Sequence, residues 1–176
     1  KDGYLVNPFV YDGRTEITTE LLSQKGYLFQ TTDDDGNEIE EVFTKKDFEK
    51  RFLSEETNRI FCETFIKNAK RDPFTNEMGK SLVFCVSQKH AGKITQILNE
   101  YADAMFPGKY NSDFAVQVTS SIDGSQQMTV DFSNNVLNGN SKSDDYYKTS
   151  KTRVCVTVGM MTTGYDCTDL LNIAMM

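Results

Sequence analysis

Several residue types that enzymes often depend on are scarce in this chain of 176 residues. It contains no tryptophan, three prolines and a single histidine, His90, and none of its four cysteines belongs to a CxxC pair. A zinc site needs closely spaced cysteine and histidine ligands, so we predict no metal centre. With one imidazole in the chain, a Ser-His or Cys-His catalytic triad is also disfavoured. Scattered cysteines, with Cys85 and Cys155 inside apolar runs, are typical of a reduced, cytoplasmic protein.

Signatures for nucleotide binding and membrane insertion are missing as well. No GxxxxGK[ST] phosphate loop occurs, and no GxGxxG follows an apolar run. The N-terminus has no charged-then-apolar signal region. No apolar run approaches the roughly 20 residues that a membrane-spanning helix needs. The sequence therefore favours neither a self-sufficient enzyme nor a membrane protein. Because it begins at Lys1 and stops within an apolar segment, we expect it to be a piece of a longer protein.

The net charge of −7 argues against simple electrostatic attraction to a nucleic acid backbone. Much of the negative charge falls within residues 33–56, which begin with three consecutive aspartates, Asp33 to Asp35. The acidity thus weakens a DNA-binding hypothesis, but it leaves room for a phosphate-contacting surface elsewhere in the chain.

The first part of the chain is predicted to be β-rich. Short strands are expected around Tyr4 and at Phe9–Tyr11, and Asp35-Gly36 is a turn signal between strands at 27–31 and 39–43. The acidic turn could also be a calcium loop. Since Glu38 occupies the position where such a loop needs glycine, a solvated hairpin turn is favoured.

Helical and strand patterns alternate in the rest of the chain. Capping-type residues predict helices beginning at Thr44 and Ser54, the second one ending near residue 70. The further predictions are strands at 81–86, 114–119 and 153–158, a helix at 88–105 capped by Ser87, a weakly helical stretch at 125–137 and a polar, mobile insertion at 138–152. This alternation predicts an α/β domain, a parallel sheet flanked by helices, over residues 72–176. Residues 1–71 are predicted to be a linking segment.

Polar residues follow each of the three predicted strands of this sheet. Ser87 to His90 follow the first strand, Thr119 to Ser121 the second, and Thr162 to Asp166 the third. Hydroxyl groups, backbone N–H groups and a helix N-terminus on one edge suit contact with phosphate groups without base specificity. Each group also has an ordinary structural explanation as a helix cap or a turn.

Four strings give the chain a resemblance to a known family. They are GYLVNP at 3–8, VFTKKDF at 42–48, KSLVFCVSQKHA at 80–91 and VTVGMMTTGYD at 156–166. With them, residues 2–176 resemble the motor subunit (R, or HsdR) of type I restriction enzymes. The last two strings are similar to motifs IV and V of the superfamily 2 helicases and translocases. The resemblance implies a RecA-like fold of the P-loop NTPase type, here the second motor domain, truncated before motif VI.

The resemblance also implies roles for individual residues. The implied DNA contacts are Ser87, Gln88 and His90 in motif IV, Thr119 and Ser120 after the second strand, and Thr162 and Thr163 in motif V. Gly164 and Asp166 would face the nucleotide, and Thr157 matches the upstream threonine of motif V loosely. Asp166 is followed by Cys167-Thr168, where relatives have an apolar residue and proline.

The family's activity is ATP-dependent DNA translocation coupled to endonuclease cleavage in the bacterial cytoplasm. The cofactors implied are ATP and Mg²⁺, whose phosphate loop and acidic ligands would lie outside this chain, so no catalytic residue is expected within it. The partners implied are the double-stranded DNA backbone, the first RecA-like domain of the same subunit, and the methylation and specificity subunits. Two alternatives stay open: another superfamily 2 translocase, and a non-catalytic α/β interaction module.

Overall fold

The structure is a computed structural model that describes residues 8–11, 28–32, 38–42, 55–142, 147–162 and 165–176. The chain divides into two compact units, Lys1–Thr57 and Asn58–Met176. In the first unit, strand β1 (Leu28–Thr32) pairs antiparallel with β2 (Glu38–Val42), which confirms the predicted hairpin. Residues 8–11 have no regular secondary structure, so the strand predicted at Phe9–Tyr11 is wrong. The strand predicted around Tyr4 and the helix predicted from Thr44 lie outside the described residues.

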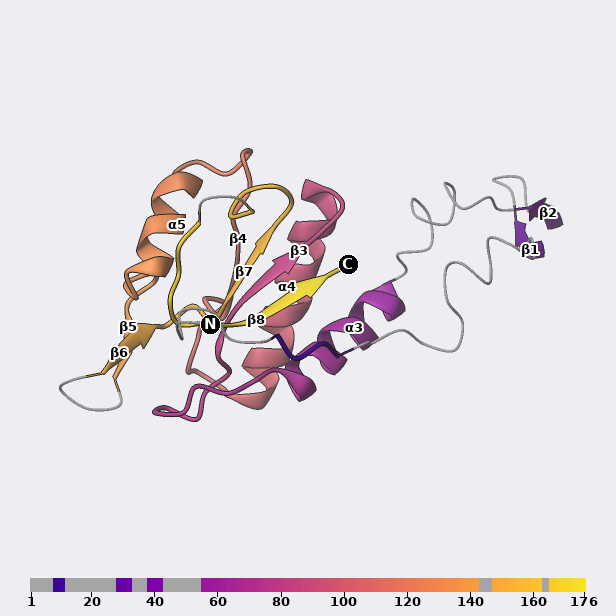
Figure 1. The fold of residues 1–176 in the computed structure, drawn as a ribbon. Helices are drawn as coiled ribbons and strands as arrows, with labels where there is room; N and C mark the ends of the chain where they lie inside the picture. Colours follow the sequence, from indigo (N-terminus) through magenta and orange to yellow (C-terminus); the bar gives the residue numbers. More distant parts are fainter. Residues whose placement is uncertain (1–7, 12–27, 33–37, 43–54, 143–146, 163–164) are drawn as a thin grey trace. The chain divides into compact units, whose positions relative to one another are not determined.

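The second unit is built on a four-stranded parallel sheet (Figure 1). Its strands are β3 (Lys80–Phe84), β4 (Ala115–Gln117), β7 (Val154–Thr157) and β8 (Leu170–Met175), in the order β4-β7-β3-β8. All neighbouring pairs are parallel. The two central strands, β3 and β7, are buried at nearly every position, as expected for strands covered on both faces. The three predicted strands are confirmed, with ends shifted by one or two residues, and the final apolar segment forms β8.

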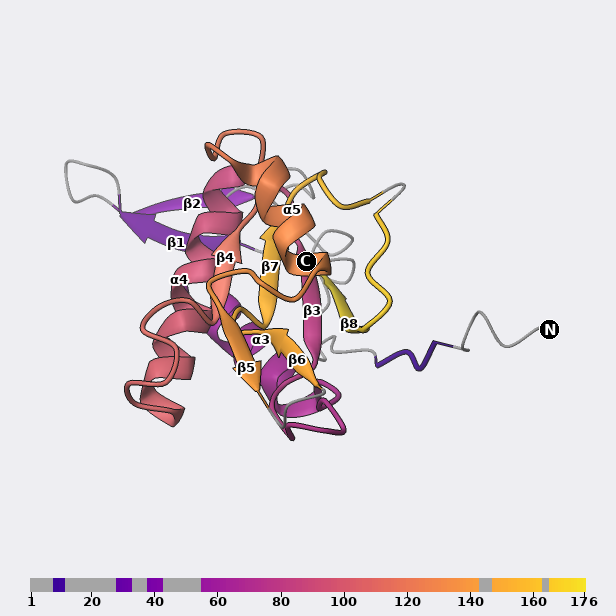
Figure 2. The ribbon, with the colours of Figure 1, turned by 90° about the vertical axis from the view of Figure 1, so that its left-hand side faces the viewer.

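Helices cover both faces of this sheet (Figures 1 and 2). Helix α4 (Gln88–Met105) buries Ile94, Leu98 and Ala102 in one core cluster, to which α3 (Glu55–Asn68) contributes Cys62. Helix α5 (Ser125–Ser133) buries Phe132 in a second cluster on the opposite face. The predicted α/β architecture is confirmed at this level. None of the helices in the described part of the chain has the length and apolar character needed to cross a membrane.

Of two weak predictions for residues 125–152, the helical one is confirmed over part of its length, and the mobile insertion is wrong where a hairpin forms. The stretch after Gly124 is a regular helix, because burial of Phe132 (0% exposed) against the sheet compensates for a poor amphipathic pattern. Much of the expected mobile insertion is a hairpin, in which β5 (Asn140–Lys142) pairs antiparallel with β6 (Lys148–Ser150). Residues 143–146 between the two strands lie outside the described residues.

A buried arginine explains why this polar hairpin is ordered. The Arg153 side chain is fully buried, and its Nη1 donates hydrogen bonds to Thr149 Oγ1 at 2.7 Å and to the Ser150 carbonyl at 3.0 Å. Its Nε donates to the Met78 carbonyl at 2.6 Å. Thr149 and Ser150 of β6 are therefore buried because they accept hydrogen bonds from a buried cation.

A second buried cation connects the sheet to α5. The Lys80 side chain is 1% exposed, and its Nζ donates to the Phe132 carbonyl, to Asn135 Oδ1 at 2.9 Å and to Asp169 Oδ1 at 2.8 Å. Burial opposes ionisation of Asp169, but the hydrogen bond and positive charge of Lys80 hold its pKa below the ordinary value. This pair fixes the start of β3 to the segments that follow α5 and precede β8.

The predicted boundary between a linking segment at 1–71 and a RecA-like domain at 72–176 stays a prediction. In the structure, the helix that precedes this point belongs to the core of the second unit, since Cys62 of α3 is fully buried there.

Candidate nucleic acid contact edge

Three loops leave the sheet at its carboxyl edge, after β3, β4 and β7. The backbone hydrogen bonding of the sheet continues one residue past the ends of β3 and β4. Cys85 N donates to the Thr157 carbonyl at 2.8 Å, and Val118 N donates to the Val156 carbonyl at 2.8 Å. The loops that follow therefore begin side by side, which is the position where open parallel sheets bind ligands.

The first loop ends in the capped N-terminus of α4. Ser87 has extended backbone angles (φ −154°, ψ 161°), and its Oγ accepts a hydrogen bond from His90 N at 3.2 Å, which confirms the predicted cap. Ser87, Gln88 and Lys89 are all exposed. The first N–H groups of a helix have no intrahelical acceptor, and the helix dipole favours an anion at this end. The N-terminus of α4 is therefore able to bind a phosphate group.

Side chains connect this loop to the one after β4. Gln88 Nε2 donates to Ser120 Oγ at 3.3 Å. Gln117 Nε2 donates to the Gln88 carbonyl at 3.0 Å and to Thr119 Oγ1 at 3.3 Å, and Thr119 Oγ1 lies 3.1 Å from Ser121 Oγ. The structure thus brings together residues that are about thirty positions apart in the chain, as the predicted edge requires.

The predicted residues differ in how accessible they are. Ser120 is exposed, but Thr119 is 1% exposed, so its hydroxyl group orients its neighbours and does not face solvent. Gln117 was not predicted from the sequence. A polar residue inside the apolar run AVQV was the available signal, because a partly buried amide needs hydrogen-bond partners.

His90 lies away from this group. Its side chain is 6% exposed, and Nε2 is 3.2 Å from Asn58 Oδ1 of α3. Burial, and secondarily the charge of Lys93, hold the imidazole pKa below its ordinary value, so the ring is neutral at pH 7. Nδ1 is buried and has no hydrogen-bond partner among the described residues. The implied DNA contact of His90 does not fit this placement, and we leave the residue out of the proposed surface.

The third loop, after β7, is stabilised by its own hydroxyl groups. Thr157 is buried and its Oγ1 donates to the Met160 carbonyl at 3.2 Å, while Thr162 is exposed and its Oγ1 donates to the Gly159 carbonyl at 3.0 Å. Met161 between them has a positive φ of 63°. Thr162 is thus on the surface of the loop, whereas Thr157 supports it from within.

The remaining motif V residues are only partly covered by the structure. Thr163 and Gly164 lie outside the described residues, and Asp166 is exposed. Tyr165 OH donates to the Thr129 carbonyl of α5 at 3.2 Å, which holds the described part of this loop against the face that carries α5.

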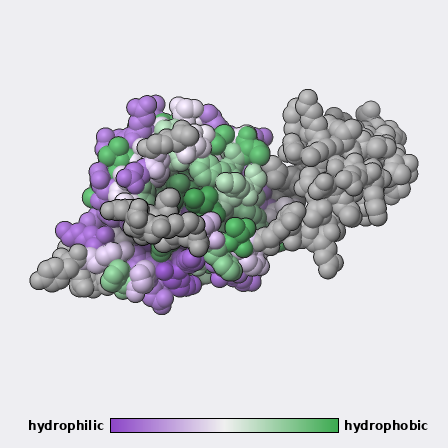
Figure 3. All heavy atoms as spheres, viewed as in Figure 1, coloured by the Kyte–Doolittle hydropathy of each residue, from purple (hydrophilic) through white to green (hydrophobic). Residues whose placement is uncertain are grey.

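An apolar hollow of about 390 Å³ lies beside this loop. It is lined by Leu82, Phe84, Met161, Thr162, Tyr165, Leu170, Ile173 and Met175. The exposed face of β8 contributes Ile173 (59% exposed) and Met175 (79% exposed), and Figure 3 shows an apolar surface over β3 and β8. No helix occurs in the described part of the connection from β7 to β8, so none of the described helices covers this half of the sheet face.

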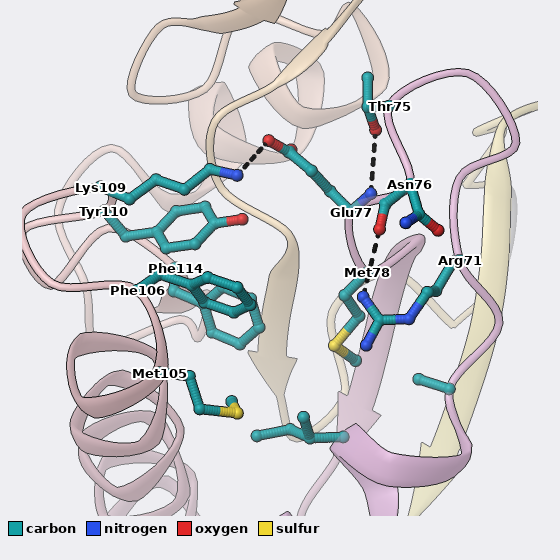
Figure 4. A pocket seen from close by; sticks show the side chains of 12 residues that line it. Arg71, Thr75, Asn76, Glu77, Met78, Met105, Phe106, Lys109, Tyr110 and Phe114 are labelled. Atoms are coloured by element: carbon teal, nitrogen blue, oxygen red, sulfur yellow. Dashed lines mark hydrogen bonds and ion pairs between the residues drawn. The ribbon is translucent and has the colours of Figure 1, made fainter.

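A smaller hollow of about 130 Å³ lies at the opposite end of the sheet, beside residues that precede β3 and β4. Figure 4 shows Lys109 pointing toward Glu77 and Arg71 toward the backbone of Asn76. Lys109 Nζ is 2.6 Å from Glu77 Oε1, and Arg71 Nη1 donates to the Asn76 carbonyl at 3.1 Å. Because its charged groups are already paired, this hollow is a weaker candidate than the carboxyl edge.

The described residues contain no group of three or more His, Cys, Asp or Glu side chains that could hold a metal ion. In comparisons with family models, with curated proteins and with solved structures, nothing matches this chain.

Proposed function

We propose that this chain is part of the second RecA-like domain of an ATP-dependent DNA translocase, the R subunit of a type I restriction enzyme, and that its carboxyl edge contacts the DNA backbone. The observation that carries the proposal is the gathering at one edge of the α4 N-terminus, the Gln88 amide and the Ser120 and Thr162 hydroxyl groups. These groups come from the loops after β3, β4 and β7. The parallel α/β sheet is the architecture that the proposed family requires.

The chemistry of this edge suits a motor that moves along any sequence. Backbone N–H groups and hydroxyl groups bind phosphate oxygens, which are the same at every step and carry no sequence information. The net charge of −7 implies weak binding by this chain alone. Tight binding to DNA would then need the other domains of the motor, including the first RecA-like domain. Recognition of a target sequence would need the separate specificity subunit.

ATP and Mg²⁺ would be held mainly by the first RecA-like domain. Toward a nucleotide, the described residues offer the exposed carboxylate of Asp166 and contain no phosphate loop. These residues are suited to form one side of a nucleotide-binding site, and the other side would come from the first RecA-like domain. Stabilising the transferred phosphoryl group needs cationic groups from both sides, so we expect no ATP hydrolysis by this chain alone.

The proposal is tested by mapping DNA contacts on the isotope-labelled chain by NMR. Two duplexes of unrelated sequence are added at low salt. We expect amide shifts concentrated at residues 87–89, 119–121 and 159–162, the same for both duplexes and reduced as salt is added. Shifts spread evenly over the chain, or none at this edge, would refute the proposed contact surface.

The nucleotide part of the proposal needs a second experiment. The chain is joined to a first RecA-like domain, and DNA-stimulated ATPase is compared for the wild type, Asp166→Ala and, as a control away from the carboxyl edge, Glu63→Ala on the exposed surface of α3. We expect loss of hydrolysis in Asp166→Ala only, with circular dichroism unchanged. Equal rates in all three would mean that Asp166 does not face the nucleotide.

The apolar hollow favours one other candidate, a non-catalytic α/β interaction module. Its lining residues Ile173 and Met175 would then form a protein-binding surface. Under this alternative, Ile173→Ser would abolish partner binding, and DNA would leave the amide signals of the carboxyl edge unchanged.

A further inference from the structure

We infer that Gln117 is a positioning residue that holds the loops after β3 and β4 together as one contact surface. The inference rests on the proposed function, since it concerns how the same edge would present its phosphate-binding groups. Gln117 is half-buried at the end of β4, behind the exposed residues Gln88 and Ser120.

The sheet order explains why a side chain is needed here. Strands β3 and β4 are not neighbours, because β7 lies between them. No backbone hydrogen bonds therefore join the loops that follow β3 and β4 directly, and the ladders place the starts of these loops only through β7. Gln117 Nε2 spans this gap by donating to the Gln88 carbonyl at 3.0 Å, and the Gln88 side chain reaches back to Ser120 Oγ at 3.3 Å.

A glycine in α4 provides independent support. A Cβ atom added to Gly92 would lie 3.1 Å from Gln117 Oε1, closer than most side chains tolerate. Glycine inside a helix is less stable than alanine. Its presence at this position is explained by the approach of the Gln117 amide, which lies against the first turn of α4.

The consequence is a preorganised edge. The two hydrogen bonds from Gln117 fix the first residue of α4 and the buried hydroxyl group of Thr119. They thereby set the spacing between the α4 N-terminus and Ser120, the two groups that would contact the DNA backbone. Groups held in place before binding lose less conformational freedom on binding, so affinity is higher.

The test compares three variants of the chain in the NMR titration with duplex DNA. Gln117→Met keeps the length of the side chain but removes both hydrogen bonds. We expect the dissociation constant to rise about fivefold, which is the size of change that the net contribution of a typical hydrogen bond would produce. Gly92→Ala displaces the Gln117 amide by a few tenths of an ångström, which should lengthen its hydrogen bond to the Gln88 carbonyl and also weaken binding. The denaturation midpoint of this variant is measured alongside. Gln96→Met on the exposed side of α4 is the matched control and should bind like the wild type.

Weaker binding by Gly92→Ala at an unchanged or higher denaturation midpoint would separate positioning from stability, because a purely structural role predicts that an equally stable variant binds as well as the wild type. Wild-type affinity in Gln117→Met would overturn the inference. If the wild type itself shows no DNA-induced shifts at this edge, the proposed function is refuted, but the positioning role of Gln117 is not yet tested. The free protein then still tests the positioning role: exchange of the His90 and Ala91 amides, which donate to Ser87, should accelerate at least about threefold in Gln117→Met. Unchanged exchange would overturn it.

Discussion

Replacing Asp169 by asparagine tests how much of the fold depends on the buried ammonium group of Lys80. The pair has an Nζ to Oδ1 distance of 2.8 Å, and the two side chains are 1% and 28% exposed. Removing one partner of a buried pair leaves the other charge uncompensated, which costs about 3–5 kcal/mol in fully buried cases. Asp169 is partly hydrated, and Lys80 keeps its hydrogen bonds to Asn135 and the Phe132 carbonyl. We therefore expect a loss of about 2–3 kcal/mol in the free energy of unfolding.

Asp113→Asn provides a matched control. Asp113 Oδ2 lies 2.9 Å from Lys151 Nζ, nearly the same distance, but these side chains are 37% and 25% exposed. A solvent-screened pair of this kind contributes less than about 1 kcal/mol. Urea unfolding at pH 7, followed by circular dichroism, measures both variants. Equal losses in the two variants would refute the claim that burial gives the Lys80 pair its strength.

The pH dependence of the same pair has a defined sign. The pKa of Asp169 is held below its ordinary value in the folded protein, so its contribution to stability is complete above the unfolded pKa, about 3.9. That contribution is lost as pH falls through the lower, folded pKa. Wild-type stability should therefore fall more between pH 5 and pH 2 than the stability of Asp169→Asn. Parallel pH profiles for the two proteins would contradict the assignment.

Three further predictions concern other parts of the second unit. Ser87→Ala should lower the free energy of unfolding by about 1 kcal/mol through loss of the α4 cap, whereas Ser87→Asp should retain it, as urea unfolding would show. Because burial lowers the pKa of His90, stability should decline as pH falls below about 6.5, and this decline should be smaller in His90→Gln when unfolding is followed from pH 8 to pH 5. Burial raises the pKa of Cys62 and Cys85 to about 12, so a thiol reagent at pH 8 should modify them far more slowly in the native protein than in urea; equally fast reaction would contradict their burial.

Local signals were sufficient for most of the regular elements. The bounds of α4 follow from the capping residue Ser87, the apolar stripe and Pro107-Gly108, and the structure has them at the predicted residues. The hairpin of β1 and β2 follows from Asp35-Gly36 between two alternating runs. These features depend on residues a few positions apart, so the sequence alone determines them.

The candidate site was partly predictable for the same reason. Polar residues that follow buried parallel strands must emerge at one edge, and Ser87, Gln88 and Ser120 do so. What each side chain does there was not predictable. His90 is turned into the core against Asn58, and Thr119 is buried behind the surface, because packing against α3 and β4 sets their environment.

The tertiary structure decided those features that depend on partners far apart in the chain. Helix α5 forms because Phe132 is buried against the sheet, and the polar β5–β6 hairpin forms because Arg153 needs its acceptors. The link from Gln117 to Gln88 likewise exists only once β7 has been inserted between β3 and β4. Short-range patterns determine which segments become helices and strands. Burial of charges and polar groups, which the fold alone brings together, determines how those segments are joined and what their edge presents.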